Sequence, residues 1–246
     1  MSAEPDGRWK RFLDAVVDGD DGGVARLLRT APGMLRARME LDYFVEAIPH
    51  WLYVGDTLLH LEAAALRTGA VRLLLDAGAD PNAENRRGAT PLHYACDARP
   101  RSGGTWDPTG QAAIIDLLVE HQADSEHVDR GGATALHRAV RARSLAAVQH
   151  LLKAGARVDR RLSKGGSSPL HLAVQSTGAG GTAGAVIEQI EIIGLLLGHG
   201  ADPTARDANG KSSYDCARSD GVRDALERRR GAKRPGRGRE RLAIVR

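Results

Sequence analysis

The sequence has 246 residues, of which 4% are aromatic, and a formal net charge of +4 that comes mainly from the last 20 residues. Without those residues, which contain nine Lys or Arg and two acids, the chain is slightly acidic, so the body of the protein is not a basic one. The most apolar segment, residues 185–198, is interrupted by Glu188, Gln189 and Glu191, which excludes a membrane span there.

The N-terminus has no apolar core of the kind that export signals need. The two cysteines, Cys96 and Cys216, lie far apart in the sequence and form no disulfide framework. We therefore expect a reduced, soluble, cytoplasmic protein.

Residues 41–60 (LDYFVEAIPHWLYVGDTLLH) contain four of the nine aromatic residues of the chain. Such a cluster either packs as a cap over the end of a larger structure or forms a binding surface. Which of these two roles applies depends on the structure that the following segments form.

Five copies of a short motif come next, and they are the strongest signal in the chain. They are TLLHLEAAA at Thr57, TPLHYACDA at Thr90, TALHRAVRA at Thr134, SPLHLAVQS at Ser168 and SSYDCARSD at Ser212. The offsets between them are 33, 44, 34 and 44 residues. The first four copies are each followed by a Leu-rich segment and then by a polar stretch with Gly two positions before the next motif, at Gly88, Gly132, Gly166 and Gly210.

Each part of the repeat has a structural reason. The Thr or Ser is suited to cap the first turn of a helix, and Pro91 and Pro169 suit the first helical position, where no backbone N–H is needed. The Leu and Ala residues of both segments predict two closely packed helices. The second helix is expected to end at a left-handed Gly, and a polar residue to begin each finger turn. These positions are Gly78, Gly155 and Gly200, and Asn85, Asp129 and Asp207.

These residues resemble the ankyrin repeat, with TPLH at 90–93, SPLH at 168–171 and GADPN at 78–82. The resemblance covers about Thr57 to Arg229 and implies an all-α repeat solenoid of paired helices with β-turn fingers, stacked on a continuous core. We expect about four repeats with a degenerate cap at each end. The expected organisation is a capping repeat at 1–56, which includes a degenerate helix pair at 11–32, then repeats and C-terminal cap at 57–229, and a basic disordered tail at 230–246.

In this frame the aromatic stretch is an enlarged first finger. The interval from Ala37 to Thr57 takes 20 residues, whereas the equivalent interval from Ala83 to Thr90 takes seven. We expect the aromatic finger to serve both as a cap over the end of the stack and as part of a binding surface. Phe44, Ile48 and Trp51 are predicted to pack as a cap, and Tyr43 and Tyr53 to lie nearer the concave groove.

Two repeats carry about eleven extra residues, at 99–110 and 176–186, which predict loops on the edge opposite the fingers. They are either tolerated insertions or a paired edge site anchored by Trp106, and a lengthened second helix is an alternative for the later one. Gln122 replaces the helix-ending Gly. Glu62 replaces an Ala, so it has to reach solvent, find a basic partner or stay protonated, and a locally rotated helix is the simplest expectation.

Nothing in the sequence indicates catalysis, a cofactor, a metal site or a small-molecule substrate, and the resemblance implies a non-catalytic scaffold for protein binding. The four motif histidines recur one per repeat, too far apart to share an ion, and the resemblance implies that they hydrogen-bond the finger backbone. The expected partner is a protein with an acidic patch. The alternative is nucleic acid bound by the Arg-rich tail and third repeat. The predicted partner-binding residues are Arg86, Arg87, Asp97, Arg130, Arg141, Lys164, Gln175, Lys211, Tyr43 and Tyr53.

Overall fold

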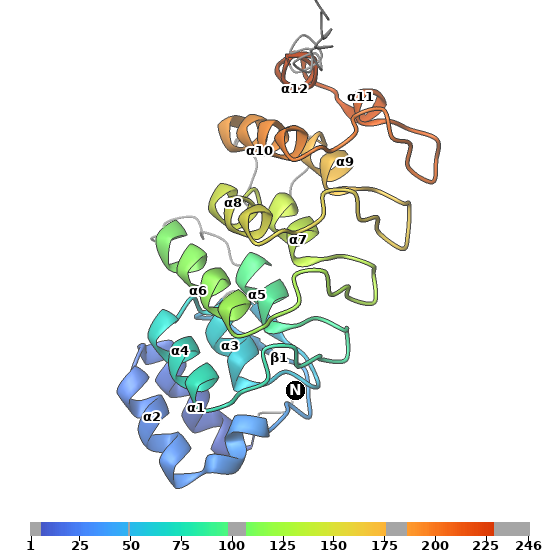
Figure 1. Ribbon diagram of the computed structural model, residues 1–246. Coiled ribbons are helices and arrows are strands. Elements are labelled where there is room, and N and C mark those ends of the chain that lie inside the picture. The colour runs from blue at the N-terminus through green and yellow to red at the C-terminus, as the bar shows by residue number, and fades with distance from the viewer. Residues whose placement is uncertain (1–5, 49, 98–106, 176–185, 229–246) are drawn as a thin grey trace, which may run out of the picture.

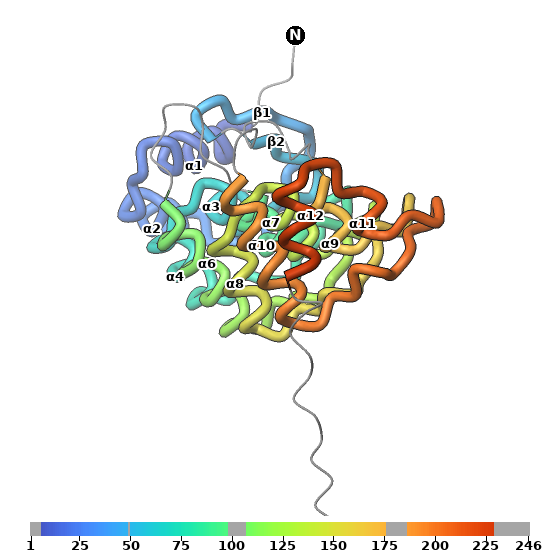
Figure 2. The backbone as a smooth tube through the Cα atoms, turned by 90° about the horizontal axis from the view of Figure 1, so that it is seen from above, coloured from blue at the N-terminus to red at the C-terminus, as the bar shows by residue number. Residues whose placement is uncertain are grey.

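The computed structural model describes residues 6–48, 50–97, 107–175 and 186–228, which form a stack of six helix pairs (Figure 1). Seen from above, the second helices line one side of the stack and the finger loops project from the other (Figure 2). The all-α repeat solenoid is therefore confirmed. The helix pairs are α1 (Gly7–Asp18) and α2 (Asp21–Thr30), α3 (Leu58–Ala64) and α4 (Thr68–Asp76), α5 (Pro91–Asp97) and α6 (Pro108–Glu120), α7 (Ala135–Arg141) and α8 (Leu145–Lys153), α9 (Pro169–Ala173) and α10 (Val186–Gly198), and α11 (Ser213–Cys216) and α12 (Asp220–Glu227).

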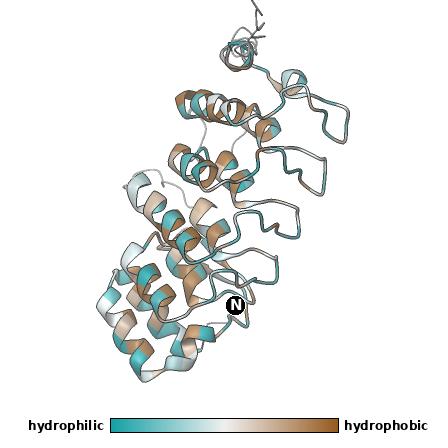
Figure 3. Ribbon diagram, in the orientation of Figure 1, coloured by the Kyte–Doolittle hydropathy of each residue, from teal (hydrophilic) through white to brown (hydrophobic). Residues whose placement is uncertain are grey.

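The core runs through the whole stack because each helix packs on its equivalents in the neighbouring pairs. First helices contact first helices, from α3 through α5 and α7 to α9, and second helices do the same from α2 to α10. Hydrophobic residues gather where the helices face one another, and the fingers are mainly hydrophilic (Figure 3). The repeated Ala of the motif is fully buried at Ala95, Ala139 and Ala173, where a small side chain lets the helices approach closely.

The motif histidine joins each helix cap to the next finger. The Nδ1 atom of His93 accepts the backbone N–H of Thr90, so the proton of the neutral ring sits on Nε2, which donates to the carbonyl of Ala133 at 2.9 Å. His60 and His171 make the same pair of contacts, to Ala89 and Lys211. Burial lowers the pKa of His60, and that of His93 to about 3, so these rings are neutral at neutral pH. The predicted structural role is confirmed for these three.

His137 departs from this pattern, because its Nε2 makes no well-aligned hydrogen bond within the described residues, although the backbone of Ser167 and of Arg160 lies close enough to oppose the lowering of its pKa by burial. The finger that follows α8 is one residue longer than the others, and it closes with Leu162 N–H donating to Ser167, five positions on. The other fingers close over four positions, from Asn85, Asp129 and Asp207, whose side chains also accept two backbone N–H groups of the turn. The finger turns predicted at those three residues are confirmed.

Adjacent fingers are joined by one backbone hydrogen bond at each junction, for example from Arg130 N–H to Arg87 O at 2.9 Å and from Ser163 N–H to Gly131 O at 2.9 Å. The finger glycine is needed where this junction forms. Gly132 has φ of 78°, and a Cβ there would collide with the backbone of Ser163. Gly210 has φ of 74° but belongs to the last finger, and a Cβ there would meet no atom of the described residues within 4 Å.

The ends of the second helices follow the sequence predictions. Gly78, Gly155 and Gly200 are left-handed, with φ of 88°, 90° and 92°, and Gln122 is also left-handed at 68°. In both repeats with insertions the second helix is longer, since α6 and α10 have 13 residues whereas α4 and α8 have nine. This lengthening was foreseen only for α10. Most of both insertions, including Trp106, lies outside the described residues.

The enlarged first finger follows a short 3-10 helix, η1 (Pro32–Arg36), and forms a β-hairpin of β1 (Tyr43–Val45) and β2 (His50–Leu52). The hairpin lies on the side of the stack where the first helices of the pairs lie (Figure 2). Ile48 is buried as expected, but Phe44 and Trp51 are 40% and 49% exposed, so the prediction that they pack as a cap is wrong. Phe44 pairs with Trp51 across the strands, and the alternation of a strand turns both outward while Val45 and Leu52 point inward.

Glu62 is 1% exposed, and neither of its carboxyl oxygens has a hydrogen-bond partner within the described part of the chain. Burial, reinforced by the negative charge of Asp21, raises the pKa of Glu62 to about 8, and the opposing charge of Arg67 does not offset this. The helix is not rotated to bring this side chain to solvent, because every residue of α3 is buried. Of the three outcomes expected, the carboxyl stays protonated at neutral pH.

We predict that Gly132→Ala destabilises the protein more than Gly210→Ala. Both substitutions place Ala at positive φ, which costs on the order of 1 kcal/mol. Only the first also forces two finger backbones apart, which adds about 1–3 kcal/mol, as overpacking does. Urea unfolding of both variants measures the difference, and equal losses would contradict the finger-junction explanation.

We also predict that Glu62 makes a contribution to stability that is lost as pH rises, opposite in sign to the contribution of the buried His60 and His93, whose lowered pKa values add stability as pH rises towards 6.5. The pKa of Glu62 is higher in the folded than in the unfolded state, so the folded state binds the extra proton and this contribution to the free energy of unfolding decreases as pH rises from about 4.5 to about 8, by up to about 5 kcal/mol. Glu62→Gln should remove this contribution, so that the difference in unfolding free energy between the variant and the unmodified protein changes with pH, and the exposed Glu46→Gln should keep the contribution. Urea titrations at pH values across this range test the prediction, and parallel curves for Glu62→Gln and the unmodified protein would refute it.

Candidate functional site

The predicted partner-binding residues lie along two adjoining surfaces, the fingers and the first helices. Among them, the cationic side chains are all exposed, and Asp97, Gln175, Tyr43 and Tyr53 are partly buried. Arg86 and Arg87 lie on the finger before α5, Arg130 on the next and Lys164 and Lys211 on the two that follow, while Asp97, Arg141 and Gln175 lie on or just after first helices. The fold therefore brings them onto one side of the stack, the side away from α4, α6 and α8 (Figure 2).

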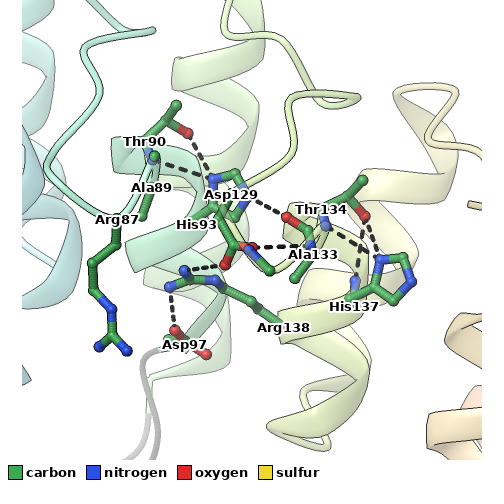
Figure 4. Close-up of polar contacts among 12 residues, drawn as sticks. Arg87, Ala89, Thr90, His93, Asp97, Asp129, Ala133, Thr134, His137 and Arg138 are labelled. Atoms are coloured by element: carbon green, nitrogen blue, oxygen red, sulfur yellow. Dashed lines mark hydrogen bonds and ion pairs between the residues drawn. The ribbon is translucent and has the colours of Figure 1, made fainter. Parts of the chain in front are cut away.

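Arg138 forms a half-buried ion-pair cluster that joins two repeats (Figure 4). Its guanidinium donates to Asp97 at 2.6 Å and to Asp129 at 2.7 Å, and the three side chains are only 12% to 14% exposed. Arg141 adds a longer contact to Asp97, at 3.5 Å. Asp97, which the sequence placed among the contact residues, is thus held by cations of the neighbouring helix.

The charges of this cluster are stable in the folded protein. Burial by itself would raise the pKa of Asp97, but Arg138 and Arg141 hold it below its usual value. In the same way the pKa of Asp129 is lowered against the effect of burial, because its carboxylate accepts from Arg138 and from finger N–H groups. Since the positive and negative groups satisfy one another, the cluster fixes the geometry of α5, α7 and the finger between them.

The first two cations of the finger surface are held by the enlarged finger. Arg87 donates to the Tyr53 hydroxyl at 2.6 Å, with its guanidinium 4.6 Å from the centre of the Tyr53 ring. Arg86 pairs with Asp42 and lies 5.7 Å from the same ring. Tyr53 therefore lies among the fingers, and it orders two arginines that would otherwise be free on an exposed loop.

The next three cations are different. Arg130, Lys164 and Lys211 are exposed, and their side chains make no hydrogen bond or ion pair to any residue that the structure describes. They lie in three consecutive fingers. Together they are the cations of the predicted surface that form no ion pair within the described residues, although Lys211 lies within electrostatic reach of Asp215.

Two important side chains were missed from the sequence. Arg138 occupies a motif position where the other copies have Leu61, Tyr94, Leu172 and Cys216, and a cation in a mainly apolar column was the available signal. Asp56 is fully buried and accepts hydrogen bonds from Tyr94 Oη at 2.6 Å and from Asn85 Nδ2 at 2.8 Å. It fastens the hairpin to α5, and its partners are too distant in sequence to be recognised in advance.

Within residues 6–48, 50–97, 107–175 and 186–228, no group of three His, Cys, Asp or Glu side chains is arranged to hold a metal ion. In the same residues, no helix combines the length and apolar character needed to cross a membrane. The polar side chains that do cluster bind one another or the backbone.

Comparison with known proteins agrees with the fold. A family model described as "Ankyrin repeats (3 copies)" matches residues 108–207, and one described as "Ankyrin repeat" matches residues 54–86. The chain is similar to the B-cell lymphoma 3 protein homolog of Mus musculus, with 34% identity over 167 residues, and to the human B-cell lymphoma 3 protein, with 33% identity over 162 residues. These alignments cover about two thirds of this chain and about a third of each relative.

A shorter match, 50% identical over 94 residues, is to the human tRNA endonuclease ANKZF1, and it covers 38% of this chain and 12% of that protein. The two family matches together cover more than half of the chain. Because the sequence pattern, the stacked helix pairs and the finger turns all agree, the chain belongs to the ankyrin repeat family.

Proposed function

We propose that this chain is a non-catalytic protein-interaction module that binds an acidic patch of a partner protein along its fingers and first helices. The observation that carries the proposal is the row of three unpaired cations, Arg130, Lys164 and Lys211, on consecutive fingers. Exposed cations on three consecutive fingers suit a partner that presents several carboxylates along the same stretch of surface.

The spacing of the row sets the size of the partner patch. Stacked helices lie about 8–10 Å apart, so the three cations span on the order of 20 Å. A specific interface buries roughly 800 Å² on each partner, which is a patch of comparable width. On the first helices, Arg141 and Gln175 extend the same surface, and Arg141 contributes the guanidinium geometry that binds carboxylates in pairs.

The buried cluster supports this surface without contacting the partner. Arg138 is satisfied by Asp97 and Asp129, so it holds the fingers and first helices in one arrangement before binding. A surface that is ordered in advance loses less conformational entropy on binding. In this proposal residues 57–229 form the binding unit, residues 1–56 cap it and residues 230–246 are an appended tail. The two unpaired cysteines, Cys96 and Cys216, are consistent with a cytoplasmic location.

The proposal predicts that reversing the charge of the row abolishes binding. Arg130→Glu with Lys164→Glu should reduce the protein recovered on the immobilised full chain from cell lysate by more than tenfold at about 0.15 M salt. The matched control is Lys153→Glu, at the exposed end of the outer helix α8, which should leave recovery unchanged. Recovery that survives the double reversal would rule out the finger row as the binding surface.

A second arm separates protein from nucleic acid as the ligand. Treatment with nuclease should leave the recovered protein in place, and unrelated DNA fragments should not bind the chain at this salt concentration. Loss of the partner on nuclease treatment, with DNA affinity that falls steeply as salt rises, would instead support phosphate binding through the Arg-rich tail and third repeat.

A further inference from the structure

The hairpin carries an exposed aromatic pair that the fold does not use. Phe44 and Trp51 face each other across β1 and β2, with ring centres 5.3 Å apart. Both are among the most exposed large hydrophobic residues of the described chain, at 40% and 49%. Two aromatic rings in tilted contact on a short hairpin form a compact apolar patch, and exposed aromatic residues of this kind often anchor protein interfaces.

The hairpin is held in place without this pair. Its inward face is buried through Val45 and Leu52, and His50 stacks on Tyr94 of α5 with ring centres 4.3 Å apart. Tyr94 in turn donates to the buried Asp56. Because these contacts all lie on the other face of the hairpin, Phe44 and Trp51 are not needed to fasten it to the repeats.

The hairpin that carries the aromatic pair adjoins the proposed cationic surface. His50, next to Trp51 in β2, lies within electrostatic reach of Asp97 and Arg138. Asp97 also forms an ion pair with the exposed Arg141. On its other side the hairpin leads directly into Tyr53, which orders Arg87. Figure 2 shows the hairpin of β1 and β2 on the side of the stack where the first helices lie, so the hairpin that carries the patch lies between α5 and the finger of Arg86 and Arg87.

We propose that Phe44 and Trp51 are the apolar anchor for the partner, and that the partner segment combines acidic residues with one large apolar side chain. This inference rests on the proposed function and adds the specificity that charge alone lacks. The apolar side chain would contact the two rings, while neighbouring carboxylates would face Arg141 and the finger cations. Charge complementarity favours this occupant over a basic or neutral segment, and aromatic anchors commonly supply most of the binding energy at such interfaces.

The test is a selection from a phage-displayed library of random peptides against the full chain. The expected peptides are rich in Asp and Glu and share a large apolar residue at a fixed distance from the acids. A Phe44→Ala, Trp51→Ala variant should still select acidic peptides but lose the apolar preference, and it should bind the original peptides at least about tenfold more weakly. The matched control is Ile187→Ala, an exposed apolar residue on α10, which should select the same peptides as the unmodified chain.

A Trp51→Phe variant supplies a further measurement. It keeps an aromatic ring at the anchor and should restore binding to within a few fold, whereas only chains with Trp51 should show a change in Trp51 fluorescence when a selected peptide binds. Urea unfolding checks that the Ala variants keep their fold, which is expected because both side chains are exposed.

The outcomes separate the two proposals. Acidic peptides without a shared apolar residue, or an apolar preference that persists in the double Ala variant, would overturn the anchor and leave the cationic surface standing. Peptides with no acidic preference would overturn the proposed function, and with it the anchor.

Discussion

The neutral histidine that links three of the helix caps to the finger that follows is the contact on which this stack depends. Its Nδ1 accepts the N–H of the capping Thr or Ser, and its Nε2 donates to a carbonyl of the following finger, as in His60, His93 and His171. One ring thus satisfies a helix end and a loop at once, and both would otherwise leave buried polar groups unpaired. The contact works only while the ring is neutral, and burial, which lowers the pKa of His60 and His93, keeps it so.

The fingers depend on this link and on one another. Each finger is closed by an Asn or Asp side chain, or by one extra residue, and is joined to the next by a single backbone hydrogen bond. Gly132 is required where two finger backbones meet, and Gly210 is at a finger with no successor among the described residues. Because the fingers are fixed in register, their exposed side chains are held in a constant arrangement, which places Arg130, Lys164 and Lys211 on three consecutive fingers although they are not at equivalent positions of the turn.

The enlarged first finger changes which cations of the finger surface are free to bind a partner. It fills the inner side of the stack beside α5, fastened by Asp56 and Tyr94, and it orders Arg86 and Arg87 through Asp42 and Tyr53. On α3 in the same region, Glu62 is buried without a hydrogen-bond partner among the described residues and keeps its proton at neutral pH. Both features lie in the first helix pairs, where the sequence departs most from its own repeat.

The sequence by itself determined the repeat, because caps, helix-ending glycines and finger turns are local and recur at constant spacing. Leu92, Pro91, His93 and Asn85 have the roles that the motif predicts, whereas Gln122 keeps the left-handed conformation of the Gly it replaces, although its cost predicted a rearranged helix end. Only the tertiary structure decided which side chains face each other across repeats. The pairing of Arg138 with Asp97 and Asp129, the attachment of Tyr94 to Asp56 and the outward turn of Phe44 and Trp51 join residues far apart in the chain. Whether a strand residue points inward or outward depends on the register of β1 and β2 against α5, and nothing local in the sequence sets that register.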